Sequence, residues 1–249
     1  MRRALVPKGL PERPALDMAS CFLPADANVG GDFFVVGEGR GGTSIVVVGD
    51  VVGRGLNAAL RASYIRTLLV GFMRSCNDPA RILILANEAL ADDEPGGVDF
   101  ATAACVVHRP ERRDVAWALA GHPPPLWLDE GEPLQTDLVG PPLGIGREFE
   151  VATSRADLEP GAGVLVYTDG ITEARNGDGD LFGDERLGAA LAACPGEDPA
   201  TTIDSVRAKV ESFTGGPFGD DACMLALRAR ASLSSGDADE VCSPHLVAP

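Results

Sequence analysis

The run Ile45-Val46-Val47-Val48-Gly49-Asp50 constrains the fold more than any other stretch of this chain. Consecutive β-branched residues without polar alternation are typical of a strand that is buried on both faces. The run ends on a carboxylate, and the glycine-punctuated segment 51–55 follows it directly. The sequence therefore predicts a central strand that carries Asp50 to an edge of the core.

Three further aspartates stand at the ends of strand-like runs: Asp32 before residues 33–36, Asp169 after residues 164–168, and Asp220 before residues 222–227. Two of the four acids thus precede their strands and two follow them. In an antiparallel sheet the start of one strand lies beside the end of its neighbour. We therefore expect all four side chains to gather at one edge.

Four clustered carboxylates need a source of positive charge, because like charges at close range raise one another's pKa. Oxygen-only ligands suit Mg²⁺ or Mn²⁺. Each aspartate also adjoins a glycine, which lets the backbone approach an ion or a phosphate closely. The alternative for any one of them is structural, because aspartates flank strands and stabilise turns in many proteins. The hypothesis is a divalent metal centre at the edge of a sheet.

Composition narrows the class of protein. The 249 residues, 45% hydrophobic and 23% charged, are typical of one globular domain with loose ends. A formal charge of −16 argues against nucleic acid or an anionic membrane surface as partner. No run approaches the roughly 18 apolar residues of a membrane span, and the six cysteines lack a C-x-x-C pair. We expect a soluble, cytoplasmic protein that acts on a protein or on a small phosphate ester.

The ends of the chain differ from its middle. Residues 1–14 are rich in arginine and proline, which predicts a linker remnant. Residues 231–249 contain serine and aspartate but few large apolar side chains, which predicts a disordered acidic tail. The folded domain is expected over residues 15–230.

Periodic apolar residues predict a helical hairpin directly after the Asp50 strand. The first helix has large apolar residues spaced four apart, and further apolar residues lie between them. We expect all of them to form one broad buried stripe: Leu56, Leu60, Tyr64, Leu68 and Phe72, filled in by Ala59, Ile65 and Leu69. Asp78 and Pro79 supply an N-cap and a first-turn proline for the second helix. Asp198 and Pro199 do the same for a later helix. Further strands are expected over residues 16–23, 102–107 and 115–120.

Other chemical signals are weaker. Arg54 lies between two glycines just after Asp50 and could contact a phosphate, although a solvated loop arginine is an equal alternative. His122 precedes three prolines, and anchoring that loop is its favoured role. Residues 176–180 resemble the start of an EF-hand loop, but Leu181 replaces the required glycine, so a turn is predicted. The chain lacks a G-x-S-x-G nucleophile motif and a P-loop.

Several of these segments together resemble the ordered motifs of the SpoIIE/RsbU-type branch of the PP2C (PPM) metal-dependent serine/threonine phosphatases. The similarity runs from about residue 5 to residue 228. The main motifs are GGDF at 30–33, GDVVGRG at 49–55, GHPPP at 121–125, PPLGIG at 141–146, YTDGITE at 167–173 and GDD at 219–221. LVP at 5–7 and FGDERL at 182–187 are also similar.

The resemblance implies an α/β (α+β) sandwich, in which two packed antiparallel β-sheets are flanked by helices, over residues 15–230. It implies two Mn²⁺ or Mg²⁺ ions at one edge, bridged by Asp50. The Val51 carbonyl would bind one ion, Asp169 and Asp220 the other, and Asp32 would act directly or through water. A metal-bridging hydroxide would then attack phosphorus in line, with Asp50 and Asp32 as the catalytic acids.

By the same resemblance, the substrate is a phosphoserine or phosphothreonine on a regulatory protein, with a STAS-domain anti-anti-sigma factor as the favoured target. A second copy of the chain or a separate sensor protein are further candidate partners. Two alternatives are a non-catalytic module that binds phosphoproteins and a phosphohydrolase for small esters. The chain departs from the family pattern at Val35 and Val36, where an acid is common, and at Cys223, where threonine is common.

Overall fold

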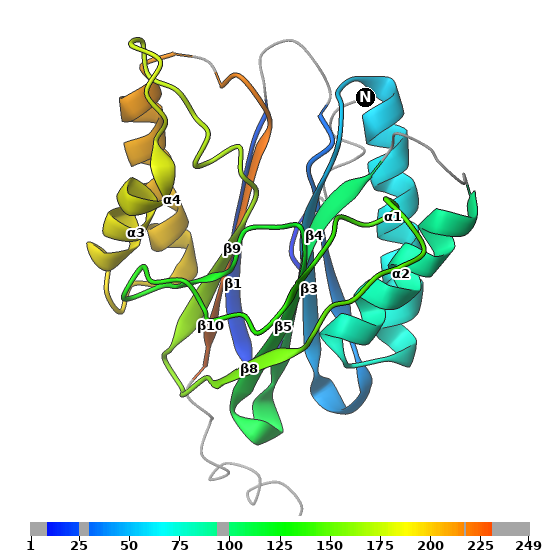
Figure 1. Ribbon diagram of the computed structural model, residues 1–249. Coiled ribbons are helices and arrows are strands. Elements are labelled where there is room, and N and C mark those ends of the chain that lie inside the picture. The colour runs from blue at the N-terminus through cyan, green and yellow to red at the C-terminus, as the bar shows by residue number, and fades with distance from the viewer. Residues whose placement is uncertain (1–8, 25–29, 94–99, 217, 231–249) are drawn as a thin grey trace, which may run out of the picture.

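The computed structural model describes residues 9–24, 30–93, 100–216 and 218–230. Two β-sheets pack face to face, and a pair of helices covers the outer face of each (Figure 1). The strands are β1 (Leu16–Leu23), β2 (Phe33–Glu38), β3 (Ser44–Val51), β4 (Ala101–Arg109), β5 (Asp114–Ala120), β6 (Leu126–Trp127), β7 (Val139–Gly140), β8 (Ser154–Asp157), β9 (Gly163–Tyr167) and β10 (Ala222–Ala229). The helices are α1 (Leu56–Ser75), α2 (Pro79–Asp93), α3 (Gly183–Ala192) and α4 (Pro199–Thr214).

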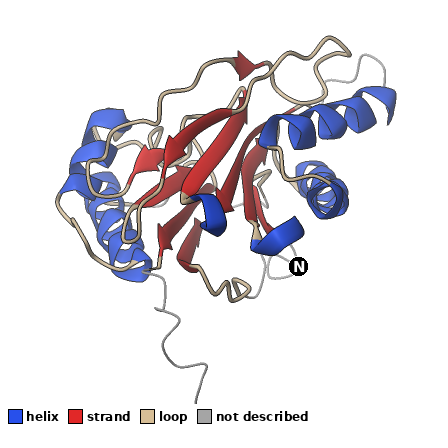
Figure 2. Ribbon diagram, turned by 90° about the horizontal axis from the view of Figure 1, so that it is seen from below, coloured by secondary structure: helices blue, strands red, loops and turns tan. Residues whose placement is uncertain are grey.

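The expected α+β sandwich is confirmed. One sheet has the order β1-β10-β9-β6, and the other has the order β2-β3-β4-β5-β7, with β8 also pairing with β5. Helices α1 and α2 pack on the second sheet, whereas α4 packs on the first and carries α3 (Figure 2). Pairing is antiparallel except between β5 and the short β7, which run parallel. The prediction of purely antiparallel sheets is therefore wrong for this one pair.

Strand β3 shows why the run of β-branched residues is continuous. Ile45 and Val47 face α1 and α2, whereas Val46 and Val48 face the other sheet, and all four are at most 1% exposed. Both faces of the strand are therefore inside the protein, as the sequence predicts. The strand is held between β2 and β4, which fixes the position of Asp50 near its end.

Helix α1 forms where predicted but buries a different face. Leu56 and Leu60 are 52% and 58% exposed, and Tyr64 is also exposed. The buried residues are Ala58, Ala59, Ala62, Ile65, Leu69 and Met73. Three alanines on this face let the first turns of the helix lie close to the sheet, so Leu56, Leu60 and Tyr64 point away from it. The predicted stripe is wrong for these three residues. It is correct for Ala59, Ile65 and Leu69, and Leu68 and Phe72 are partly buried against the same core.

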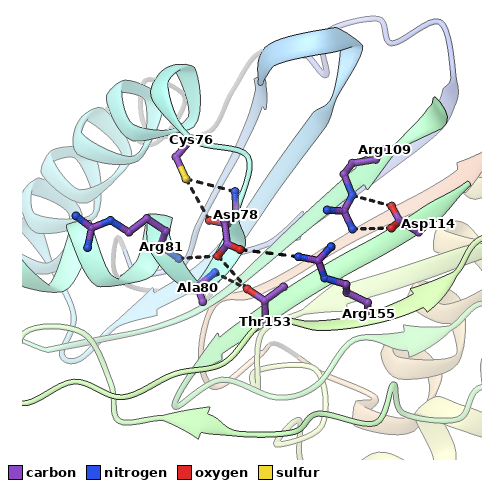
Figure 3. Close-up of polar contacts among 8 residues, drawn as sticks. All are labelled: Cys76, Asp78, Ala80, Arg81, Arg109, Asp114, Thr153 and Arg155. Carbon is purple, nitrogen blue, oxygen red and sulfur yellow. Dashed lines mark hydrogen bonds and ion pairs between the residues drawn. The ribbon is translucent and has the colours of Figure 1, made fainter. Parts of the chain in front are cut away.

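The turn between α1 and α2 is fastened to the segment that begins β8 (Figure 3). Asp78 Oδ1 accepts hydrogen bonds from the Arg81 amide at 3.0 Å and from the Thr153 hydroxyl at 2.9 Å. The Thr153 hydroxyl accepts one from the Ala80 amide at 3.3 Å, and the Arg155 guanidinium lies 4.0 Å from Asp78. The predicted N-cap is confirmed, and it also ties the helical hairpin to the sheet.

Some elements were not predicted, namely α3 and the short strands β6, β7 and β8. The EF-hand-like segment forms the predicted turn, in which Asn176 Oδ1 accepts hydrogen bonds from the amides of Asp178 and Asp180. The predicted tail and residues 1–8 of the predicted linker lie outside the described residues. In the part of the chain that the structure describes, no helix combines the length and the apolar character that crossing a membrane requires.

Candidate metal centre

Asp32 and Asp50 come together at one edge of the six-stranded sheet. Asp50 is the seventh of the eight residues of β3, and Asp32 directly precedes β2. The antiparallel register pairs Phe33 with Gly49, which sets the two aspartates side by side. The charge of Asp50 acts on Asp32, so the two carboxyl groups lie close together.

Asp169 and Asp220 come from the other sheet. Asp169 lies two residues after the end of β9, and Asp220 lies two residues before the start of β10. The register pairs Tyr167 with Met224, so the two aspartates belong to the same end of neighbouring antiparallel strands. Both are close enough for their charges to act on Asp50. The four predicted acids therefore meet at one edge of the sandwich, and each sheet contributes two of them.

Negative charge is in excess at this edge of the sandwich. Burial, and then the charge of Asp50, raise the pKa of Asp32 well above its ordinary value. Burial raises the pKa of Asp50 to about 7, with further contributions from the charges of Asp169 and Asp220. Burial and the charge of Asp220 also raise the pKa of Asp169. Three of the four carboxyl groups thus favour a bound proton, or a cation that takes its place.

Thr168 and Asp221 support the aspartates, and the sequence analysis missed both roles. The Thr168 hydroxyl donates to Asp32 Oδ2 at 2.6 Å and accepts from the Cys223 amide at 2.8 Å. It thereby links β9 and β10 to the acid that precedes β2. Asp221 is buried, and its Oδ2 accepts a hydrogen bond from the Gly30 amide at 2.9 Å. That bond holds the loop before Asp32 against the start of β10.

Glycine at position 31 lets two oxygen donors lie together. The Val51 amide donates to the Gly31 carbonyl at 3.2 Å. A Cβ on Gly31 would collide with the Val51 carbonyl oxygen and would lie 2.8 Å from Asp50 Oδ1. Only glycine therefore allows the chain to pass so close to the Val51 carbonyl and the Asp50 carboxylate.

Arg54 lies at the same edge. Its guanidinium is 3.6 Å from Asp220 Oδ2, and both side chains are about two-thirds exposed. An exposed pair of this kind contributes little to stability, roughly 0 to 1 kcal/mol. Arg54 is therefore free to exchange Asp220 for another anion without a large energetic cost.

The donor set fits a hard divalent cation. It offers only oxygen, from carboxylates and one backbone carbonyl, and its raised pKa values mark a deficit of positive charge. Across the described ranges, however, no three histidine, cysteine or acidic side chains converge closely enough to hold one ion.

The departures from the family pattern are core positions in this structure. Val35 is 5% exposed and packs with the cluster between the sheet and helices α1 and α2. Val36 packs with the cluster between the two sheets. Cys223 is fully buried in β10. These three side chains pack with apolar neighbours rather than with the aspartates.

Comparison with known proteins agrees with this geometry. The family model described as Stage II sporulation protein E (SpoIIE) matches residues 40–230. The phosphoserine phosphatase RsbU of Bacillus subtilis (strain 168) is 25% identical over 183 residues, which cover 73% of this chain and 54% of RsbU. The chain spans between 34% and 54% of the length of three curated relatives that it matches.

Two solved structures share the fold. The SiaA-PP2C domain of Pseudomonas aeruginosa has a TM-score of 0.78 at 24% identity, with 91% of this chain and 92% of that chain covered. A Mycobacterium tuberculosis structure of RsbU and RsbW domains has a TM-score of 0.70 at 27% identity, with 89% of this chain and 62% of that chain covered. With the family match over residues 40–230, the conclusion is that the chain belongs to the SpoIIE family and has a PP2C-type fold.

Proposed function

We propose that this chain is a metal-dependent protein serine/threonine phosphatase that acts in the cytoplasm. The observation that carries the proposal is the edge where both sheets deliver two aspartates each, three of them with raised pKa values. A cluster of carboxylates that outnumbers the cationic side chains beside it is what a site for divalent cations requires. The similarity to RsbU, named as a phosphoserine phosphatase, supports the same reaction here.

In this proposal the site would hold two Mn²⁺ or Mg²⁺ ions. Asp50 would be shared between them, with the Val51 carbonyl, Asp169 and Asp220 as further ligands, and Asp32 would act directly or through water. When bound, such ions supply an activated water as nucleophile and neutralise charge on the phosphoryl group. Thr168 keeps Asp32 oriented through its 2.6 Å hydrogen bond. Arg54, whose ion pair with Asp220 is exposed, would be available to pair with the phosphate of the substrate.

The favoured substrate is a phosphorylated regulatory protein, in particular a STAS-domain anti-anti-sigma factor. Two relatives are named as phosphoserine phosphatases, and the sequence motifs resemble the SpoIIE/RsbU-type branch. The net charge of −16 argues against nucleic acid as a partner. Helix α1 exposes Leu56, Leu60 and Tyr64 next to the Asp50 segment. A separate sensor protein, or a second copy of this chain, would act on the site most directly there.

The test is phosphate release from a panel of phosphorylated STAS proteins and from small phosphate esters, each with Mn²⁺, Mg²⁺ or EDTA. We expect metal-dependent release from at least one protein substrate, with much higher efficiency than from the esters. Asp157→Asn, an exposed change on β8, is the control and should retain activity. Full activity in EDTA would contradict the proposal. Equal efficiency on small esters would indicate a metabolite phosphohydrolase, and failure to bind Mn²⁺ would indicate a non-catalytic phosphoprotein-binding module.

A further inference from the structure

His122 lies in the loop after β5, and its side chain is almost fully enclosed, with 4% of the residue exposed. Both ring nitrogens have partners. Nε2 lies 2.9 Å from the Tyr167 carbonyl oxygen, and Nδ1 lies 2.8 Å from the Thr102 hydroxyl. A carbonyl only accepts, so Nε2 carries the proton and Nδ1 accepts a hydrogen bond from Thr102.

The ring is neutral at ordinary pH, because burial lowers the pKa of His122 to about 4. A neutral imidazole has one donor and one acceptor, and His122 uses each of them once. No charge is left uncompensated in the interior. The buried imidazole therefore has all its hydrogen bonds, and its burial costs little free energy. Removal of either partner would leave a buried polar group unpaired.

The two partners of His122 belong to different sheets. Thr102 is on β4 of the six-stranded sheet, where it pairs directly with Asp50 across the ladder. Tyr167 is the last residue of β9 in the four-stranded sheet, two residues before Asp169. The imidazole therefore joins the two sheets at the edge where the aspartates meet. This is more than the loop-anchoring role that the sequence suggests.

The loop that carries His122 is itself held at that edge. The Gly121 amide donates to the Gly140 carbonyl at 2.8 Å, and a Cβ on Gly121 would lie 2.7 Å from the Pro142 ring. Gly121 also has φ +62°, a conformation that favours glycine. With its backbone fixed on this side and three prolines following, His122 has little freedom to follow a shift of either sheet.

We propose that His122 is a positioning residue that fixes the separation between the strand ends carrying Asp50 and Asp169, and thereby sets the affinity of the site for divalent cations. The inference rests on the proposed function, since it takes these aspartates as metal ligands. His122 itself contacts neither the cation nor the substrate. Its effect passes through Thr102 and Tyr167 to the spacing of the donors.

The experiment measures the Mn²⁺ dissociation constant by calorimetry and the metal-free melting temperature of each variant. His122→Phe keeps the ring but removes both hydrogen bonds, and Thr102→Val removes one of them with little change of shape. Each should weaken Mn²⁺ binding about tenfold or more, as loss of supporting hydrogen bonds does at other metal sites. The double variant should bind no more weakly than His122→Phe alone, because both changes break the same bridge.

Two matched controls separate positioning from general destabilisation. Thr102→Ser keeps the hydroxyl and should restore Mn²⁺ affinity to near that of the unchanged protein. Thr136→Val also removes a hydroxyl that is bonded to a buried ring, because the Thr136 hydroxyl accepts a hydrogen bond from Trp117 Nε1 at 2.9 Å. Trp117 pairs with Val106, four residues beyond Thr102 along β4, so this change should lower stability without weakening Mn²⁺ binding.

The outcomes are distinguishable. If the unchanged protein binds no Mn²⁺, the proposed function fails together with the positioning role. If it binds Mn²⁺ and Thr102→Val binds equally well, the positioning role alone is overturned. The same holds if Thr136→Val weakens binding as much as Thr102→Val does. Should His122→Phe not fold, the comparison of Thr102→Val with Thr102→Ser still decides.

Discussion

Asp50 differs from the other three acids because it lies within a strand whose neighbours fix it on both sides. We expect Asp50→Asn to lower turnover roughly 10³-fold or more, about 4 kcal/mol of barrier, because it removes the proposed bridge between two ions. Metal-free stability should not fall, since burial and neighbouring charges already disfavour its ionised form. Turnover and the metal-free melting temperature should be measured together, with Asp157→Asn as control. Near-normal turnover, or a variant that does not fold, would return Asp50 to a structural role.

His108 offers a test of pH dependence far from the metal centre. It is 3% exposed, its Nδ1 has no hydrogen-bond partner among the described residues, and burial lowers its pKa to about 4. The unfolded chain therefore binds this proton more readily, so the contribution of His108 to stability is present above pH 6.5 and is lost as the pH falls toward 4. Between pH 7 and pH 5 the loss should be on the order of 1 kcal/mol.

Replacement of His108 by leucine should reduce this acid sensitivity, and it should also remove a buried nitrogen that lacks a partner. Urea unfolding at pH 7 and pH 5 would measure the difference in the free energy of unfolding for both proteins. His122 is unchanged in the variant, so part of the acid sensitivity should persist. An identical decrease in both proteins would show that His108 does not contribute.

At the scale of single residues, the sequence placed the four aspartates correctly at one edge, because each stands at the end of a recognisable strand. It did not predict the partners that support them. Thr168 bonds to Asp32, and Asp221 to Gly30, across more than a hundred residues of sequence. Such pairs depend on how the two sheets are stacked, which no local pattern encodes. The role of His122 was missed for the same reason.

Among the elements, the long ones follow from periodicity and the short ones do not. The bounds of β1 and the start of α2 agree with expectation, whereas β6 and β7, each of two residues, carry no periodic pattern. Helix α1 shows that apolar periodicity can predict a helix without predicting its buried face, because Leu56, Leu60 and Tyr64 were expected to be buried and are exposed. In its first turns small alanines lie against the sheet and the larger Leu56 and Leu60 are exposed.

The turn between α1 and α2 yields a prediction at this scale. Asp78→Ala removes the N-cap of α2 and the bond to Thr153, which should lower the free energy of unfolding by about 1 to 2 kcal/mol. Without these bonds the helical hairpin is held less firmly to the sheet, so amide exchange along α1 and α2 should also become faster in the native protein. Asp198→Ala, which removes the N-cap of α4, is the matched control. Equal exchange in α1 and α2 of both variants would contradict a specific role for the turn.

For the whole molecule, the proposed site joins two sheets that otherwise meet through apolar packing and a few hydrogen bonds, among them those of His122 and Thr168. A cation bound there favours only the folded state. At about 100 times its dissociation constant, each bound Mn²⁺ should therefore add roughly 3 kcal/mol to the free energy of unfolding. Melting curves at increasing Mn²⁺ would measure the effect, with Asp50→Asn as the comparison. The same increase in both proteins would place the binding elsewhere.

The strand order also determines when the molecule can become active during its own synthesis. Strand β10 is the last strand among the described residues, yet it lies between β1 and β9 and is the partner of β1 along its full length. During translation, at about 5 to 20 residues per second, β1 therefore has no neighbour in its sheet until residues 222–229 have left the ribosome. Asp220 emerges with them. A nascent chain that ends before this point lacks both the closed sheet and one of the proposed metal ligands, so catalysis should begin only after β10 has been made.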